Sequence, residues 1–368
     1  MKYKVALIGC GRISYKHIDA YVAKQNIDRI EFVAACDPVE SKAMERIEQY
    51  KKTVSNSNVK YYADYKKMLK ECKPDLVDIC TESGKHCIIA VDCLNAGCNV
   101  NCEKPMALST KDAQLMIDTA DKNKKILAVD FQNRFNAPVV KTREAYESGR
   151  FGKILHGMVQ IRWNRNEKYY EEAPWRGTWE QDGGTLMNQC THGIDLLQWM
   201  MGEDAVRVQA STRRFIRPID AEDFGSAIVE FKSGAVGIIE GSADIYPNNL
   251  NETLSIFGTK GSVVIGGLAV NKMETWRFSD SKIVGDTEEK VLNPNEKDPP
   301  SVYGFGHTAH IANVLDAMEN GTQPLNNGKS AKKALDIILA IYESQKTGKA
   351  VELPNNFSTM EMKNYFNK

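Results

Sequence analysis

The sequence lacks the features that mark several classes of protein. Its 48 basic and 48 acidic side chains cancel, so the composition provides no basic stripe for nucleic acid and no polybasic segment for a membrane surface. No apolar run approaches the roughly 18 residues needed to span a bilayer, and the first residues, Met1–Gly9, lack a signal-peptide core and cleavage site. These absences predict a cytoplasmic protein whose partner is a small molecule, with no nucleic acid and no membrane.

The nine cysteines lack the spacing of a metal site or of a disulfide framework. Eight of them lie between Cys10 and Cys102, mostly in apolar runs, and the chain shows no secretion signal. Cys87, Cys93, Cys98 and Cys102 contain no C-x-x-C pair, which zinc sites commonly use. We therefore interpret most of them as small core residues and expect no metal.

The length of 368 residues suggests two domains. Over residues 1–130, short continuous apolar runs alternate with helical patterns, as is typical of parallel strands buried on both faces. This alternation predicts an α/β domain with a doubly wound parallel sheet of the Rossmann type. The expected strands are Lys4–Gly9, Ile30–Cys36, Val59–Tyr61, Leu76–Cys80, Asn99–Cys102 and Ile126–Asp130, and the expected helices are Tyr15–Lys24, Glu40–Lys51, Asp64–Glu71, His86–Ala96 and Thr110–Lys122.

Residues 131–368 show a different pattern and are expected to form an α+β domain for substrate binding and oligomerisation. Strand-like segments with turn residues between them predict a large, mostly antiparallel open sheet. The expected strands are Ile154–Trp163, Ala205–Arg214, Gly225–Phe231, Val236–Ala243, Glu252–Phe257 and Ser262–Ile265; the expected helices are Thr185–Met201, His307–Glu319 and Ser330–Lys346; and Asp280–Pro300 is expected to be a surface loop.

A glycine turn follows the first strand and opens the first helix. Gly9 and Gly11 let the backbone turn tightly and approach a pyrophosphate, which the N–H groups of the helix can then bind. Asp37 ends the second strand, where a carboxylate accepts hydrogen bonds from ribose hydroxyls and repels a 2′-phosphate, so NAD is favoured over NADP. The alternatives are an ordinary glycine turn and a helix-capping role for Asp37.

Two further segments are candidates for catalysis. Lys104 follows the fifth strand, at the sheet edge where ligands bind, and its charge would favour an alkoxide-like substrate, although an ordinary surface lysine is the alternative. In the expected helix Thr185–Met201, Asn188, His192, Asp195 and Trp199 share one face. This stripe predicts either an acid–base histidine beside a hydrogen-bonding Asn, or a solvated face or a core histidine held by Asp195.

The segment before that helix is rich in aromatic residues and arginine. Trp163-Asn164-Arg165, Tyr169-Tyr170 and Trp175-Arg176-Gly177-Thr178-Trp179 suit stacking on a base or sugar and binding of a phosphate or carboxylate. A packing loop is the alternative. His307 and His310 lack a third ligand at suitable spacing and are interpreted as part of a helix N-terminus.

Together these motifs resemble the glucose–fructose oxidoreductase and inositol dehydrogenase superfamily, and within it the UDP-N-acetylglucosaminuronate dehydrogenases of bacterial O-antigen (lipopolysaccharide) biosynthesis. The superfamily resemblance is carried by the glycine turn with His17 behind it, Thr81 through His86, Glu103-Lys104-Pro105, Asn133-Arg134 and His192. The resemblance to the subgroup is carried by Gly9 through Ser14, Tyr169-Tyr170, Trp175 through Trp179, Asp182-Gly183-Gly184, Met187-Asn188-Gln189 and Val302 through His307.

This resemblance implies NAD-dependent oxidation of the 3-hydroxyl of a UDP-linked N-acetylated glucuronate to a ketone, by a dimer or tetramer joined through the open sheet. Lys104 and His192 would flank the hydroxyl, with His192 as proton acceptor, and no metal would take part. The implied substrate residues are Asn188, Arg165, Tyr169 and Gln189. The implied cofactor residues are Gly9, Gly11, Arg12, Ile13, Asp37, Thr81, His86, Glu103, Lys104, Gln132, Trp175 and Arg176.

The chain departs from the superfamily at two positions. Glu82 replaces the usual proline after Thr81, which places a carboxylate near the nicotinamide half of the cofactor, and Asn188 stands where many members have aspartate, as in the subgroup. Two other functions stay open: a dehydrogenase of a free sugar, inositol or glycoside, and a cofactor-binding regulator without catalysis. Arg165 and Arg176 argue against the first, and the presence of both Lys104 and His192 argues against the second.

Overall fold

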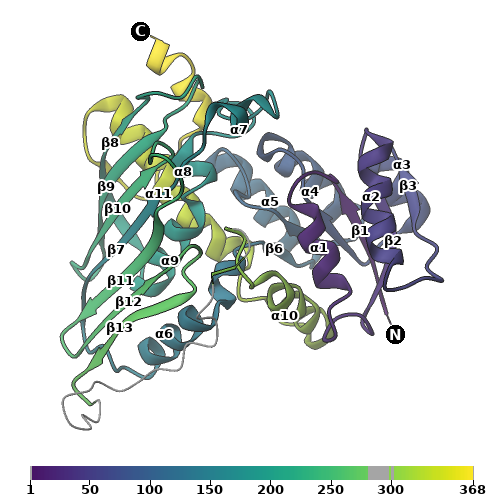
Figure 1. Cartoon of the computed structure of the whole chain (residues 1–368), viewed down its shortest axis with the longest axis horizontal. Coiled ribbons are helices and arrows are strands. Elements are labelled where there is room, and N and C mark those ends of the chain that lie inside the picture. Colours follow the sequence, from purple (N-terminus) through teal and green to yellow (C-terminus); the bar gives the residue numbers. More distant parts are fainter. Residues whose placement is uncertain (1, 281–297, 300–301, 368) are drawn as a thin grey trace. The chain divides into compact units, whose positions relative to one another are not determined.

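The computed structural model describes residues 2–280, 298–299 and 302–367 (Figure 1). The chain forms two compact units: unit 1 comprises Met1–Ala107, Lys111–Phe131 and Gly306–Lys332, and unit 2 comprises Leu108–Thr110, Gln132–Phe305 and Lys333–Lys368. The break after Phe131 lies at the expected boundary near residue 130, but Gly306–Lys332, expected in the second domain, belongs to unit 1. Among the described residues, no helix combines the length and the apolar character needed to cross a bilayer.

Unit 1 contains a six-stranded sheet in the order β3-β2-β1-β4-β5-β6, in which every neighbouring pair is parallel. The sheet confirms the predicted Rossmann architecture. Its strands are β1 (Tyr3–Ile8), β2 (Ile30–Cys36), β3 (Lys60–Tyr62), β4 (Leu76–Ile79), β5 (Asn99–Cys102) and β6 (Leu127–Val129). The helices are α1 (Ser14–Tyr21), α2 (Glu40–Lys51), α3 (Tyr65–Cys72), η1 (Ser83–Lys85), α4 (His86–Asn95), α5 (Thr110–Asn123) and α10 (His307–Asn320).

Helix α10 joins unit 1 because its apolar side chains complete the core around β1. Ile311, Val314 and Leu315 are fully buried in one cluster with Leu7 of β1 and Ile18 of α1. Figure 1 shows α10 beside α1, although nearly 300 residues separate them in the chain. Burial of these aliphatic side chains, each contributing about 1.5–3 kcal/mol, fixes α10 on this sheet.

Unit 2 contains an eight-stranded sheet in the order β13-β12-β11-β7-β10-β9-β8-β14. Only β7 and β10 pair in parallel, so the predicted mostly antiparallel sheet is confirmed within the described residues. Its strands are β7 (Ile154–Arg162), β8 (Ala205–Arg213), β9 (Phe224–Phe231), β10 (Val236–Ser242), β11 (Asn251–Gly258), β12 (Gly261–Gly266), β13 (Lys272–Phe278) and β14 (Val351–Glu352). The helices are η2 (Gln132–Phe135), α6 (Ala137–Glu147), α7 (Glu167–Glu171), α8 (Thr185–Asn188), α9 (Thr191–Met201), α11 (Gly328–Thr347, which begins in unit 1), η3 (Thr359–Met362) and η4 (Tyr365–Asn367).

The single helix expected over Thr185–Met201 is wrong, because the helix is interrupted after Asn188. The N–H of Cys190 bonds to the carbonyl of Thr185, and a new ladder begins where Ile194 bonds to Cys190. Cys190 packs against Gly241 of β10, so closely that a Cβ on Gly241 would lie 2.6 Å from the Cys190 sulfur. Asn188 and His192 therefore do not share the face of one continuous helix.

Two other expectations concern the cysteines and the segment Asp280–Pro300. All nine cysteines are free thiols and seven of them are buried, which confirms that most are core residues. The loop expected over Asp280–Pro300 lies almost wholly outside the described residues.

Candidate active site

The glycine turn after β1 has the shape that a dinucleotide requires. Gly9 has φ +87°, and a Cβ there would lie 2.6 Å from the carbonyl of Cys80, so only glycine fits between β1 and β4. A Cβ at Gly11, by contrast, would meet no heavy atom within 4 Å, which leaves open space in front of the turn. Arg12 is exposed and Ile13 is half-buried just before α1, whose N-terminus has no capping side chain. These features fit a pyrophosphate at the glycine turn and the N-terminus of α1.

Asp37 lies at the carboxyl end of β2 and is 8% exposed. Its Oδ2 accepts the N–H of Cys10 at 2.9 Å, and its Oδ1 accepts the N–H of Val39 at 2.8 Å. These two bonds hold the carboxylate beside the glycine turn. A carboxylate has about four acceptor positions, so two remain for ribose hydroxyls. The capping alternative and the ribose-binding prediction are therefore compatible.

The segments after β4 and β5 are joined by His86, at the start of α4. Its Nδ1 lies 2.8 Å from the carbonyl of Pro105, and its Nε2 lies 3.0 Å from the carbonyl of Thr81. Burial lowers the pKa of His86. The histidine thus fixes Thr81 and the segment that carries Lys104 at one edge of the sheet.

Glu82 forms an ion pair with Lys85 at 2.5 Å. Partial burial would raise the pKa of Glu82, but the hydrogen bond from Lys85 lowers it overall. The carboxylate that replaces the usual proline is therefore ionised and neutralised locally.

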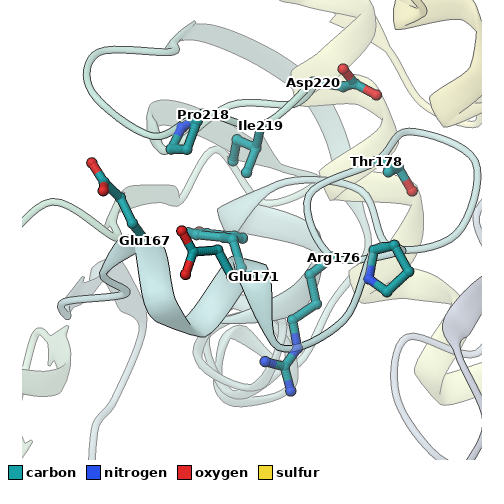
Figure 2. A pocket seen from close by; sticks show the side chains of 9 residues that line it. Glu167, Glu171, Arg176, Thr178, Pro218, Ile219 and Asp220 are labelled. Atoms are coloured by element: carbon teal, nitrogen blue, oxygen red, sulfur yellow. The ribbon is translucent and has the colours of Figure 1, made fainter.

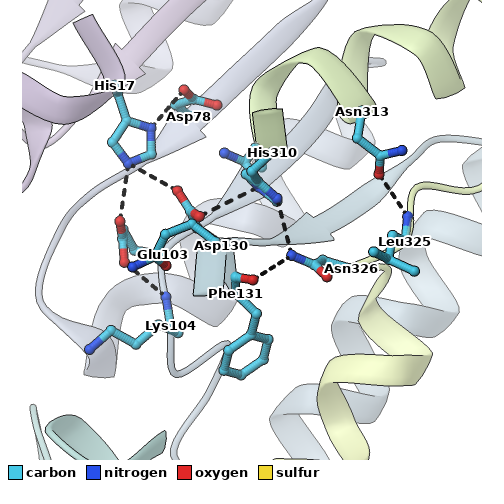
Figure 3. A network of polar contacts seen from close by, with 12 residues as sticks. His17, Asp78, Glu103, Lys104, Asp130, Phe131, His310, Asn313, Leu325 and Asn326 are labelled. Carbon is cyan, nitrogen blue, oxygen red and sulfur yellow. Dashed lines mark hydrogen bonds and ion pairs between the residues drawn. The ribbon is translucent and has the colours of Figure 1, made fainter. Parts of the chain in front are cut away.

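Glu103 directs its carboxylate into unit 1. Its Oε1 lies 3.1 Å from Nε2 of His17, and its Oε2 accepts the backbone N–H of Lys104 at 3.2 Å (Figure 3). Lys104 itself is half-buried. The sequence prediction named Glu103 and Lys104 but missed the buried partners Asp78 and Asp130, although a carboxylate within or directly after an apolar strand was a usable signal.

In unit 2, two arginines and a tyrosine gather before α8 and α9. The centre of the Tyr169 ring lies 5.4 Å from the guanidinium carbon of Arg165 and 4.2 Å from that of Arg176. The hydroxyl of Tyr169 accepts a hydrogen bond from Nε2 of Gln189 at 3.2 Å. The structure therefore brings four predicted site residues together, two of them cationic.

Asp182 orients the predicted substrate residue Asn188. The Nδ2 of Asn188 donates to Oδ1 of Asp182, and Oδ2 of Asp182 accepts the N–H of Gly177 at 2.8 Å. Asp182 is 2% exposed, and its bond with Gly177 is shielded from water. Its carboxylate couples the Trp175–Trp179 turn to α8, a role that the sequence analysis did not assign.

His192 lies in the first turn of α9. Asp195, which the sequence analysis considered as a partner of His192, bonds to Arg134 instead. Arg134 donates to both carboxylate oxygens of Asp195, from Nε at 2.7 Å and from Nη2 at 2.5 Å. The alternative of a core histidine held by Asp195 is therefore replaced by a buried arginine–carboxylate pair, which also lies against Trp199. The partner Arg134 was unforeseen.

The remaining predicted cofactor residues of unit 2 lie near this group or on η2. Trp175 is half-buried and its carbonyl accepts the hydroxyl of Thr178, and Gln132 begins η2 and donates to the carbonyl of Tyr303 at 3.4 Å. A cavity of about 240 Å³ beside α7 includes Arg176, but Glu167, Glu171 and Asp220 also line it (Figure 2). Three carboxylates make this cavity unsuited to an anionic sugar.

Comparisons with known proteins agree with this geometry. Residues 3–131 match the family described as "Oxidoreductase family, NAD-binding Rossmann fold", and residues 139–264 match the "GFO/IDH/MocA C-terminal domain". D-glucoside 3-dehydrogenase of Escherichia coli is 25% identical over 95% of this chain and 97% of its own length, and myo-inositol 2-dehydrogenase of Thermotoga maritima is 25% identical over 95% and 98%.

Two similar solved structures are WlbA dehydrogenases, each in complex with NADH and UDP-GlcNAcA. The enzyme from Bordetella pertussis is 34% identical, with a TM-score of 0.82 over 96% of this chain and 100% of that chain. The enzyme from Chromobacterium violaceum is 36% identical, with a TM-score of 0.85 over 97% of each chain.

Proposed function

Because the chain belongs to the GFO/IDH/MocA family and is an NAD-dependent sugar dehydrogenase acting on CH–OH groups, we propose that its substrate is UDP-linked N-acetylglucosaminuronate, oxidised at the 3-hydroxyl to a ketone. The observation that carries the proposal is the 34–36% identity, over nearly the whole chain, to two dehydrogenases in complex with UDP-GlcNAcA. The free-sugar dehydrogenases of Escherichia coli and Thermotoga maritima, which match most of the chain, are 25% identical.

The residues of unit 1 fit the cofactor. We assign the pyrophosphate to the Gly9–Gly11 turn and the N-terminus of α1, and the adenosine ribose to Asp37. Bound NAD would supply the acceptor for the hydride that leaves the sugar carbon. Thr81 and His86 fix the sheet edge beside which Lys104 lies.

Two side chains share the proton and charge changes of the reaction. We assign the imidazole of His192 as the base that removes the hydroxyl proton, and the ammonium of Lys104 as the group that stabilises the negative charge developing on the oxygen. Charge stabilisation of this kind contributes roughly 2.7–4 kcal/mol to the barrier in other enzymes.

Substrate recognition is assigned to unit 2. Asp182 orients the amide of Asn188, which we assign to a sugar hydroxyl. Arg165 and Arg176, both near the ring of Tyr169, are the cations that we assign to the diphosphate and the uronate carboxylate, and Arg176 would exchange its ion pair with Glu172 for the ligand. A neutral polyol would need neither arginine.

The second candidate, a dehydrogenase of a free sugar or glycoside, is favoured by the curated relatives that act on such substrates. Calorimetric titration of the NADH complex with UDP-GlcNAcA, UDP-GlcNAc and myo-inositol separates the two. A charge-assisted hydrogen bond contributes about 1.5–3 kcal/mol, so Arg165→Gln should weaken UDP-GlcNAcA binding at least about tenfold.

A matched control is Arg207→Gln, which changes a half-exposed arginine on β8 of the same unit. Equal affinity of the wild type and Arg165→Gln for UDP-GlcNAcA would show that Arg165 does not bind the substrate. Tight binding of myo-inositol alone would favour the second candidate.

A further inference from the structure

A cluster of buried ionisable groups in unit 1 has no role in the reaction proposed above. Asp78 of β4, Glu103 after β5 and Asp130 after β6 place three carboxylates together, 0%, 7% and 0% exposed (Figure 3). Buried charges are costly unless other groups compensate for them. The groups that compensate for these buried charges indicate what the cluster does.

His17 of α1 lies at the centre of the cluster with both ring nitrogens against carboxylates. Its Nδ1 is 2.9 Å from Oδ2 of Asp78, and its Nε2 is 3.1 Å from Glu103 and 3.5 Å from Asp130. Tyr21 also donates to Asp78. A carboxylate only accepts, so both nitrogens donate and the ring is an imidazolium. Burial alone would lower the pKa of His17, but Cys80, Asp78 and Glu103 raise it well above its usual value.

The cluster reaches Lys104 through Glu103. The N–H of Glu103 donates to the carbonyl of Ile79 at 2.9 Å, and its carboxylate connects His17 to the backbone N–H of Lys104. Burial acts against ionisation, but the hydrogen bond from His17 and the charge of Lys104 hold the pKa of Glu103 below its usual value. Electrostatic coupling is reciprocal, so the Glu103 carboxylate favours the charged form of Lys104.

Resting on the role proposed for Lys104, we infer that His17 and Glu103 are positioning residues: the imidazolium holds the Glu103 carboxylate, which fixes the Lys104 backbone and keeps a negative charge beside its ammonium group. Neither side chain needs to touch the substrate. Under this assignment the Glu103 side chain positions Lys104 and does not make the cofactor contact that the family resemblance had implied.

Other ionisable groups lie around Glu103. Burial and the charge of Glu103 raise the pKa of Asp130 well above its usual value. The further titratable groups that face this cluster are Cys80 directly after β4, His86 of α4, and His307 and His310 of α10.

The same atoms lie close enough to hold a metal ion, which gives a competing assignment. His17, Cys80 and Glu103 form one trio, and Glu103, Asp130 and His307 form another, with ligand atoms within 4.8 Å. A metal on Nε2 of His17 would displace the proton that this nitrogen donates to Glu103. A stoichiometric metal in the purified protein, measured by mass spectrometry, would overturn the proposal.

The first test needs no substrate. The chain has six histidines, so ¹⁵N-histidine labelling gives an assignable spectrum. His17 should retain both N–H protons at pH 8, where an ordinary imidazole is neutral, and should lose one in Glu103→Gln. Asp75→Asn, which changes a carboxylate directly before β4, at the opposite edge of the parallel sheet from Glu103, is the control and should leave the spectrum unchanged. A neutral His17 at pH 8 in the wild type would refute the inference.

The second test uses turnover. Glu103→Gln retains an acceptor for the Lys104 N–H but loses the charge, so kcat should fall roughly 10- to 100-fold while the Kd for NADH changes by less than about twofold. The alkaline limb of the kcat profile should move down by about one pH unit or more, because the ammonium form of Lys104 is no longer favoured. Glu103→Asp, which keeps the charge, should restore part of that shift.

An unchanged pH profile, or a Kd for NADH that rises in step with the loss of kcat, would contradict the inference and return Glu103 to cofactor binding. If the wild type oxidised no sugar, the proposed function would fail. The histidine spectrum would then still decide whether His17 and Glu103 form the charged pair.

Discussion

Replacing Asp195 by asparagine should strongly destabilise unit 2. Both oxygens of Asp195 accept hydrogen bonds from Arg134, both side chains are fully buried, and the guanidinium carbon lies 4.9 Å from the centre of the Trp199 ring. Asp195→Asn removes the negative charge and leaves the buried guanidinium without its counter-ion.

The magnitude follows from this burial. Removing one member of a buried ion pair costs about 3–5 kcal/mol, because the remaining charge cannot return to water. Asparagine still offers one acceptor oxygen, so we expect the lower end, about 3 kcal/mol. The double variant Arg134→Met/Asp195→Leu removes both charges and should recover most of that loss, since apolar replacements of such pairs are often neutral.

Urea unfolding followed by tryptophan fluorescence measures these changes as shifts in midpoint at constant slope. Glu147→Gln is the control: it breaks an exposed pair with Arg143 on α6 and should cost less than about 1 kcal/mol. A loss below about 1 kcal/mol in Asp195→Asn, or a double variant as unstable as the single one, would refute the reasoning.

Three other predictions follow from single contacts. Gly9→Ala places a methyl carbon 2.6 Å from the backbone of Cys80 and should lower both the Tm and the NADH affinity. A methyl group at Gly11 meets no heavy atom within 4 Å, so Gly11→Ala should keep its Tm but bind NADH at least about tenfold more weakly by fluorescence titration. Burial raises the pKa of Glu222 to about 8, so the folded chain retains a proton that the unfolded chain releases near 4.5. The free energy of unfolding should therefore fall as pH rises between these values. Glu222→Gln should flatten this slope when it is measured by urea unfolding. Asp182→Ala, which frees the amide of Asn188, should raise KM for the sugar about tenfold and leave the Kd for NADH unchanged; an unchanged KM would contradict that role.

The parallel sheet of unit 1 was predictable because each strand is a continuous apolar run buried on both faces. Ile30–Cys36 and Asn99–Cys102 match their predicted bounds. The polar residues within or directly after such strands, Asp78 and Asp130, were a signal of the charged cluster that the sequence analysis did not use. The glycine turn was predictable for a different reason, because a position with a positive φ and a close backbone neighbour, such as Gly9, requires glycine.

The features that the sequence analysis missed depend on tertiary contacts. Asp195 and Arg134 are 61 residues apart, so no helical spacing could reveal their pairing. The helix break at Cys190 follows from its packing against β10, and β14 is only two residues long. The apolar face of α10 predicts a buried helix, but whether Ile311 and Leu315 pack on the first or the second sheet is decided only in three dimensions.

NADH formation by the purified protein with NAD and four sugars tests the central claim most directly. The account predicts turnover with UDP-N-acetylglucosaminuronate and, at equal concentration, far slower turnover with UDP-N-acetylglucosamine, myo-inositol and glucose, because two cations adjoin the residues assigned to the sugar. Turnover with myo-inositol or glucose and none with the UDP-linked uronate would contradict it.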